Sequence, residues 1–167
     1  MIRKVFLLPK FVKNDQPERK QFIDDVVEEL RGKYDMSCYG GLRQLAQSQG
    51  ITTIRTNDVI ESNAVYFNTR YYIILRDYSS IGNLLASYSH ELGHVLLLHL
   101  YLSMPPAQAE PEAEYFQEQL GHKHNLWAEF VDNLPFYFCR PLFSLRWVFS
   151  EDFSRKQKMK ILQRVGA

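Results

Sequence analysis

Three side chains in the stretch His90-Glu91-Leu92-Gly93-His94 have the types and the spacing of a catalytic metal site. On an α-helix, residues four positions apart lie on one face about 6 Å apart, so both imidazoles can bind one metal ion. A tetrahedral Zn²⁺ held by two histidines needs one more protein ligand and a water molecule, and Glu91 flanks the site where it can take the proton of that water. The stretch therefore predicts a zinc centre with His90 and His94 as ligands and Glu91 as catalytic base.

The alternative is a buried structural helix in which these three polar side chains only satisfy one another. The flanking residues 84–86 and 95–98 are apolar. An acid and two histidines are costly to bury in such a helix without a compensating partner. A metal ion supplies that partner, so the zinc interpretation is favoured.

A third protein ligand must come from elsewhere in the chain. Glu129 lies in an otherwise apolar stretch with helical spacing, and Asp132 follows one turn later on a neighbouring face. This arrangement is expected for a ligand and a nearby carboxylate that orients a histidine. His99 would lie on the opposite side of the helix from the first histidine, and Glu114 and Glu118 belong to a helix whose pattern indicates an exposed charged face. We therefore expect Glu129 as ligand and Asp132 as its supporting carboxylate.

Two further histidines, His122 and His124, follow Gly121 in a polar turn. Histidines in such a turn are usually solvated. Near a zinc cleft, however, one of them can hydrogen-bond the tetrahedral intermediate of hydrolysis. Both are candidate transition-state stabilisers.

The spacing of apolar residues predicts the helices that must position this site. We expect helices over residues 18–32, 41–48 and 81–103, a proline-rich surface loop over 105–111, an acidic helix from about Glu112, and further helices over 125–134 and 151–165. Strand signals cover residues 51–54, 64–67 and 71–75, with a hairpin turn at Asn68-Thr69. Residues 73–75 favour a buried core strand over an edge that pairs with a substrate. Residues 2–8 suggest one more strand, and residues 142–149 fit helix or strand equally. These elements indicate an α+β fold, a small antiparallel or mixed sheet packed on the central motif-bearing helix.

Length and composition limit the function classes. The 167 residues, 46% of them hydrophobic, suit one domain spanning 1–167, with an N-terminal extension at 1–17 and a C-terminal extension at 142–167. A net charge of +1 argues against a general nucleic-acid binder, and the pattern of the terminal helix indicates that its five cations form a solvated face.

Charged and imidazole side chains interrupt the longest apolar segment, so no membrane span is expected. Two distant cysteines and the lack of a secretory segment favour a reducing, cytoplasmic location.

The order of these features resembles the ImmA/IrrE family of metallo-endopeptidases, whose zinc-dependent members cut helix-turn-helix repressors. The stretch Leu42-Arg43-Gln44-Leu45-Ala46-Gln47-Ser48-Gln49-Gly50-Ile51 is similar to the family's Leu-x-x-Leu-Ala-x-x-x-Gly-Ile pattern, and it precedes the strand Tyr72-Ile73-Ile74-Leu75 and then the motif helix. The family's downstream signature is similar to Glu-x-x-Ala-Asn-x-Phe-Ala followed by Leu-Leu-Met-Pro, and Glu129, Asn133 and Pro141 align with parts of it. The resemblance covers roughly residues 18–141.

This resemblance implies a zincin-like fold, Zn²⁺ as cofactor and hydrolysis of a peptide bond in a protein substrate, by likeness a transcriptional repressor of a stress response or mobile element. The runner-up interpretation is a catalytically silent metal-binding protein of the same fold that acts in regulation or by contact with a partner.

Overall fold

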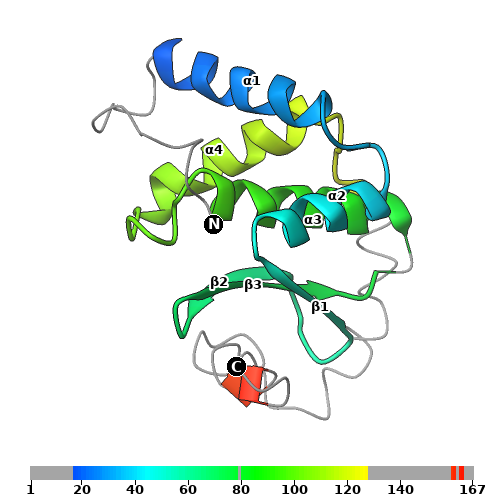
Figure 1. Ribbon diagram of the computed structural model, residues 1–167. Coiled ribbons are helices and arrows are strands. Elements are labelled where there is room, and N and C mark those ends of the chain that lie inside the picture. Colours follow the sequence, from blue (N-terminus) through cyan, green and yellow to red (C-terminus); the bar gives the residue numbers. More distant parts are fainter. Residues whose placement is uncertain (1–16, 79, 128–158, 161, 164–167) are drawn as a thin grey trace.

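Helices cover one face of a small three-stranded sheet (Figure 1). The structure is a computed structural model, and it describes residues 17–78, 80–127, 159–160 and 162–163. Within these residues the elements are α1 (Pro17–Arg31), α2 (Tyr39–Ser48), β1 (Thr52–Thr56), β2 (Asn63–Phe67), β3 (Arg70–Arg76), α3 (Ile81–Leu96) and α4 (Pro106–Gln119). The α+β class expected from the sequence is confirmed.

The sheet is mixed, with the strand order β1-β3-β2. Strand β3 pairs parallel with β1 and antiparallel with β2. The turn between β2 and β3 contains Asn68 and Thr69 at φ values of 47° and 63°. Positive φ at both central residues matches the twist of a two-residue hairpin, so the predicted turn is confirmed.

Strand β3 lies at the centre of the sheet and is buried on both faces. Ile73 and Leu75 belong to the main core together with residues of the helices, whereas Tyr72 and Ile74 pack with Leu162 in a second cluster. The short helical segment around Leu162 lies beyond the sheet, on the side away from the helices (Figure 1). Residues 73–75 therefore form a core strand, as the sequence favoured, and the free edge nearest the motif helix belongs to β2.

The motif helix α3 is shorter than predicted. It begins after Ser80, whose side chain accepts a hydrogen bond from the amide of Asn83, and it ends at Leu96 rather than near residue 103. Leu98 has a left-handed backbone with φ of 61°, while the amides of Leu98 and His99 bond the carbonyls of Val95 and His94. This hydrogen-bond pattern is a Schellman motif, which usually has glycine at the left-handed position. The helix end could not be predicted from the apolar residues 95–98, because leucine at position 98 is not a helix-stop signal.

Helix α4 begins earlier than predicted and includes residues 106–111, which the sequence suggested were a loop. Pro106 occupies the first turn, where a missing amide costs nothing, and the carbonyl of Pro105 accepts bonds from the next turn. Pro111 lies inside the helix. Ala109, Ala113 and Phe116 are buried, so packing outweighs the local effect of the second proline.

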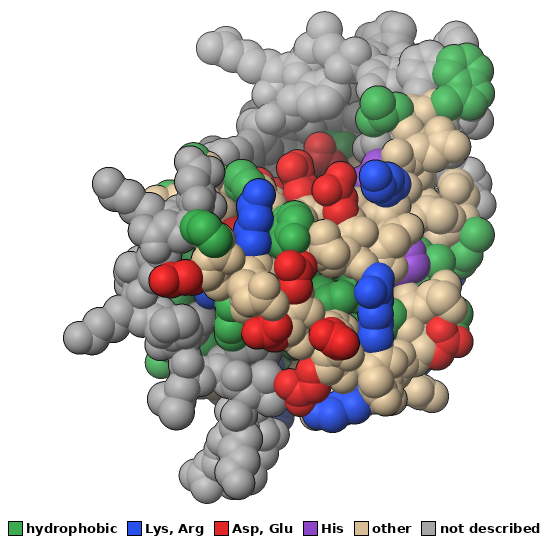
Figure 2. All heavy atoms as spheres, turned by 90° about the horizontal axis from the view of Figure 1, so that it is seen from above, with side chains coloured by type: hydrophobic (Ala, Val, Ile, Leu, Met, Phe, Trp, Pro, Cys, Tyr) green, Lys and Arg blue, Asp and Glu red, His purple; other side chains and the backbone are tan. Residues whose placement is uncertain are grey.

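The two outer helices, α1 and α4, present charged side chains to solvent. In Figure 2, which looks down on the side where these helices lie, carboxylates gather over the middle of the face and Lys and Arg stand singly among them. The buried residues of α1, including Ile23, Val26 and Val27, have the helical spacing read from the sequence. In the part of the chain that the structure describes, no helix is long and apolar enough to cross a membrane.

Several predicted elements lie outside the described residues. They are the strand at 2–8, residues 128–134 of a predicted helix, the segment 142–149 and most of the terminal helix 151–165. Residues 159–160 and 162–163 of that terminal helix are helical.

Candidate metal centre

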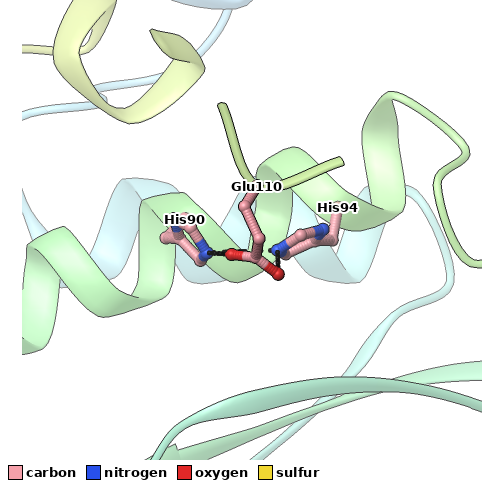
Figure 3. Close-up of side chains that lie close together, drawn as sticks. All are labelled: His90, His94 and Glu110. Carbon is pink, nitrogen blue, oxygen red and sulfur yellow. Dashed lines mark hydrogen bonds and ion pairs between the residues drawn. The ribbon is translucent and has the colours of Figure 1, made fainter. Parts of the chain in front are cut away.

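Two histidines of α3 and one glutamate of α4 converge on a single point (Figure 3). The Nε2 atoms of His90 and His94 lie 3.1 Å apart. Glu110 reaches between them, with Oε2 3.1 Å from His90 Nε2 and Oε1 3.5 Å from His94 Nε2. The predicted pair of histidines is therefore brought together, and an acid from another helix joins it.

The spacing of these donor atoms fits a tetrahedral zinc ion. With zinc–ligand bonds of 2.0–2.1 Å, two ligand atoms of a tetrahedron lie about 3.3 Å apart. The two Nε2 atoms lie 3.1 Å apart, and they lie 3.1 and 3.5 Å from two different oxygens of Glu110, so each separation is close to that value. Two imidazoles and one carboxylate also form a donor set found in catalytic zinc sites, which keep a fourth position for water or substrate.

The electrostatic environment keeps both imidazoles neutral near pH 7. Burial lowers the pKa of His90, although the carboxylate of Glu110 works in the opposite direction. Burial, followed by the neighbouring His90, lowers the pKa of His94 to about 4. A neutral imidazole has the lone pair that a metal needs, so these two side chains are prepared as ligands without first losing a proton.

Two neighbouring pockets open onto the site. A pocket of about 310 Å³ is lined by His90, Glu91, His94 and Glu110, and its far wall comes from residues 61–64 at the start of β2. Glu91 and His90 also line a second pocket, beside Glu114. The side chain of Glu110 is 51% exposed, against 10% for His94. The site therefore faces open space on the glutamate side and the core on the histidine side.

Close approach of α4 to α3 places Glu110 over the histidines. Gly93 leaves room for this approach, because a Cβ atom there would lie 3.2 Å from both Ala113 Cα and Phe116 Cδ1. The helices run in opposite directions, so the turn of α4 that carries Glu110 lies against the turn of α3 that carries His94. A glycine inside the motif is thus part of the construction of the site.

Glu129 and Asp132, the predicted third ligand and its supporting carboxylate, lie outside the described residues, and their assignment stays a prediction. Glu110 was missed because residues 105–111 were interpreted as a loop. A signal for it was present in the sequence. Glu110, Ala113 and Phe116 have the Glu-x-x-Ala-x-x-Phe spacing of the family signature that was aligned with Glu129.

His99, expected on the opposite side of the helix from His90, is buried and contacts His94 on the side away from the proposed metal. Its Nδ1 lies 3.1 Å from Nδ1 of His94, and its Nε2 lies 3.0 Å from Oε2 of Glu112. Arg19 of α1 donates two hydrogen bonds to the same carboxylate, at 3.0 and 2.7 Å. This arrangement could not be predicted from the sequence, because it joins residues far apart in the chain.

The two candidate transition-state stabilisers lie in different places. His122 contacts the carbonyl oxygen of Met36 at 2.7 Å through its Nε2, so it ties two loops together. His124 lines the pocket that contains His90 and Glu91. The buried side chain of Asn83 holds the backbone next to it, accepting from the amide of Asn125 at 2.9 Å and donating to its carbonyl.

The two weaker ligand candidates, Glu114 and Glu118, are exposed residues of α4, as their predicted charged face required. Both line the second pocket.

In comparisons with known proteins, no family model, no curated protein and no solved structure matches this chain.

Proposed function

We propose that the chain is a zinc-dependent endopeptidase in which His90, His94 and Glu110 bind the ion and Glu91 is the general base. One observation carries the proposal. One possible ligand atom from each of the three residues lies within 4.8 Å of the other two, beside a pocket that Glu91 also lines. The two histidines and the base come from neighbouring positions of α3, Glu110 comes from α4, and all four side chains line one cavity, as hydrolysis at a metal site requires.

Each residue has a defined task in this chemistry. Zinc, when bound, polarises the scissile carbonyl and lowers the pKa of water toward neutrality. Glu91 is only 7% exposed; it accepts the proton of that water and delivers it to the leaving nitrogen. His124 is our candidate for donating a hydrogen bond to the oxygen on which negative charge develops, because it lines the pocket that contains Glu91.

The family and the substrate class are part of the same proposal. We place the chain with the ImmA/IrrE metallo-endopeptidases, and the supporting features are the motif helix directly after a buried strand and the Glu-x-x-Ala-x-x-Phe spacing of α4. By that likeness the substrate is a protein of the helix-turn-helix repressor class. The pocket of about 310 Å³ is lined by residues 61–64, so an extended peptide segment can reach the site along the start of β2.

The test compares the zinc-loaded full chain with its Glu91→Gln variant on a proteome-derived peptide library and on helix-turn-helix repressors, with new termini read by mass spectrometry. We expect cleavage by the wild type, a loss of at least about 100-fold in the variant and equal zinc content in both. Glu28→Gln, the same chemical change on the exposed side of α1, is the matched control and retains full activity.

Two results would contradict the proposal. Equal cleavage by Glu91→Gln removes Glu91 as base. A zinc-loaded wild type that cleaves neither the library nor the repressors identifies the chain as a metal-binding protein without turnover.

A further inference from the structure

Behind the metal centre, four buried side chains form an unbroken row from a proposed ligand to the first helix. His94 Nδ1 lies 3.1 Å from His99 Nδ1, and His99 Nε2 lies 3.0 Å from Glu112 Oε2. Arg19 holds Glu112 through Nε and Nη2. The side chains of His99 and Glu112 are 1% and 7% exposed, so water does not supply alternative partners for this row.

The backbone ending of α3 creates this contact. The Schellman motif turns the chain back at Leu98, and the amide of His99 bonds the carbonyl of His94 at 3.0 Å. The two rings then meet edge to face, with centroids 5.2 Å apart and an interplanar angle of 75°. A continued helix would carry residue 99 away from His94, so the helix ending itself positions the second histidine.

The donors and acceptors along the row follow from one condition, that His94 offers Nε2 to a metal. Its ring proton is then on Nδ1 and is donated to Nδ1 of His99. The proton of His99 is therefore on Nε2, where Glu112 accepts it. The same carboxylate also accepts the Nε–H and Nη2–H groups of Arg19. With both histidines neutral, each of these four N–H groups has an acceptor.

We propose that His99, anchored by Glu112 and Arg19, is a positioning residue that fixes the tautomer and the ring orientation of His94. Metal-binding histidines commonly donate their second N–H to a carboxylate or a carbonyl, and here a second imidazole takes that place and passes the contact on to a carboxylate. The inference rests on the proposed metal centre and assigns a role to residues that do not touch the metal or the substrate. Without the acceptor, the His94 ring loses the partner that keeps its proton off Nε2.

Two variants of similar size separate this role from simple packing. His99→Asn puts an amide oxygen near the position of Nδ1, so it can still accept from His94. His99→Leu fills the space but accepts nothing. Both variants lose the hydrogen bond from His99 to Glu112, and in both variants Glu112 keeps its hydrogen bonds with Arg19. We expect the affinity for Zn²⁺, measured against a chromogenic chelator, to fall about 10- to 100-fold in His99→Leu and to be largely restored in His99→Asn.

A second measurement uses the wild-type chain and so does not depend on the folding of a variant. Long-range ¹H–¹⁵N correlation of the imidazoles in the zinc-loaded protein reports which nitrogen carries each proton. We expect His94 protonated on Nδ1 and His99 protonated on Nε2 with a bare Nδ1. A proton on Nδ1 of His99 overturns the proposal, as does an equal zinc affinity of the Leu and Asn variants.

The outcomes also separate this inference from the proposed function. Zinc binding by the wild type without peptide cleavage removes the peptidase and leaves the positioning role to be decided by the two variants. Peptide cleavage that depends on zinc, with His99→Leu unaffected, removes the positioning role alone. A wild type that binds no zinc overturns both.

Discussion

Gly93 of α3 lies directly against Ala113 of α4, so closely that a single added methyl group would come within 3.2 Å of the Ala113 Cα atom. The same added group would lie 3.2 Å from Phe116 Cδ1. Real Cβ contacts are rarely this short, so one helix must move. The distance between α3 and α4 also sets the distance between the histidine pair and Glu110, and the packing of Gly93 is therefore connected to metal binding.

The Gly93→Ala variant tests this connection. Alanine usually stabilises the interior of a helix by about 0.5–1 kcal/mol relative to glycine. Here we expect the opposite sign, a lower melting temperature, together with zinc affinity reduced about tenfold or more. Gly82→Ala on the same helix is the matched control, because its nearest neighbour, Ser80 Oγ, is 3.7 Å away. The control should keep wild-type zinc affinity and lose no stability. Equal behaviour of the two variants would contradict the role of Gly93.

Three glutamine variants identify the third ligand. Glu110→Gln should weaken zinc binding about 100-fold or more, because an amide neither carries the charge of a carboxylate nor matches its affinity for the ion. Glu114→Gln changes an exposed acid one turn further along α4 and should bind zinc as the wild type does. Glu129→Gln tests the position that the sequence favoured. Loss of zinc in the Glu129 variant with normal binding by Glu110→Gln would restore the original assignment. Elemental analysis and chelator competition measure all three.

The free energy of unfolding of the zinc-free protein should depend on pH through the buried carboxyl of Glu112. Burial alone would raise the pKa of this carboxyl, but the hydrogen bonds from His99 and Arg19 and the guanidinium charge outweigh it and lower the pKa to about 2. A folded-state pKa below the unfolded one gives stability that is present above the unfolded value, near 4.5, and is lost as the pH falls toward 2. The contribution is about 3 kcal/mol at pH 6, and about half of it is gone at pH 3.

Denaturant unfolding at pH 6 and pH 3 checks this expectation. The difference in unfolding free energy between the wild type and Glu112→Gln should be larger at pH 6 and should shrink toward pH 3. A difference that stays constant over this range would mean that the carboxylate does not have the depressed pKa.

The neighbouring histidines His122 and His124 should respond differently to the same substitution. His124→Ala removes a side chain from the pocket of Glu91, and we expect kcat to fall about 100-fold with zinc content unchanged. His122→Ala breaks the contact with the Met36 carbonyl and should lower the melting temperature with little effect on kcat. Steady-state kinetics with thermal unfolding of both variants provides the comparison. A normal kcat for His124→Ala would remove it as a transition-state stabiliser.

Local features of this fold could be predicted from the sequence. The amphipathic spacing of α1, the turn at Asn68 and Thr69 and the motif helix all depend on neighbours along the chain, and all are present. The end of α3 could not be predicted, because leucine occupies the left-handed position where glycine is usually found. The parallel pairing of β1 with β3 also could not be read, since it joins strands that are not consecutive.

In the site, too, local spacing could be predicted and long-range packing could not. His90 and His94 share one helix, so four-residue spacing alone places them together. Glu110 depends on how closely α4 approaches α3, and that distance is set by Gly93 and Ala113, which carry no polar signal. The contact of Arg19 with Glu112 spans 93 residues and follows only from the packing of α1 on α4. Glu129 was predicted as a ligand because it is an acid in an apolar helix. Glu110 does not have that pattern, because its side chain is half exposed.

The most direct test of the metal centre is a crystal structure of the zinc-loaded full chain with anomalous diffraction recorded on both sides of the zinc absorption edge. The account predicts one anomalous peak within about 2.0–2.2 Å of His90 Nε2, His94 Nε2 and a carboxylate oxygen of Glu110. A peak elsewhere, or one whose third ligand is another residue with Glu110 turned away, would contradict it.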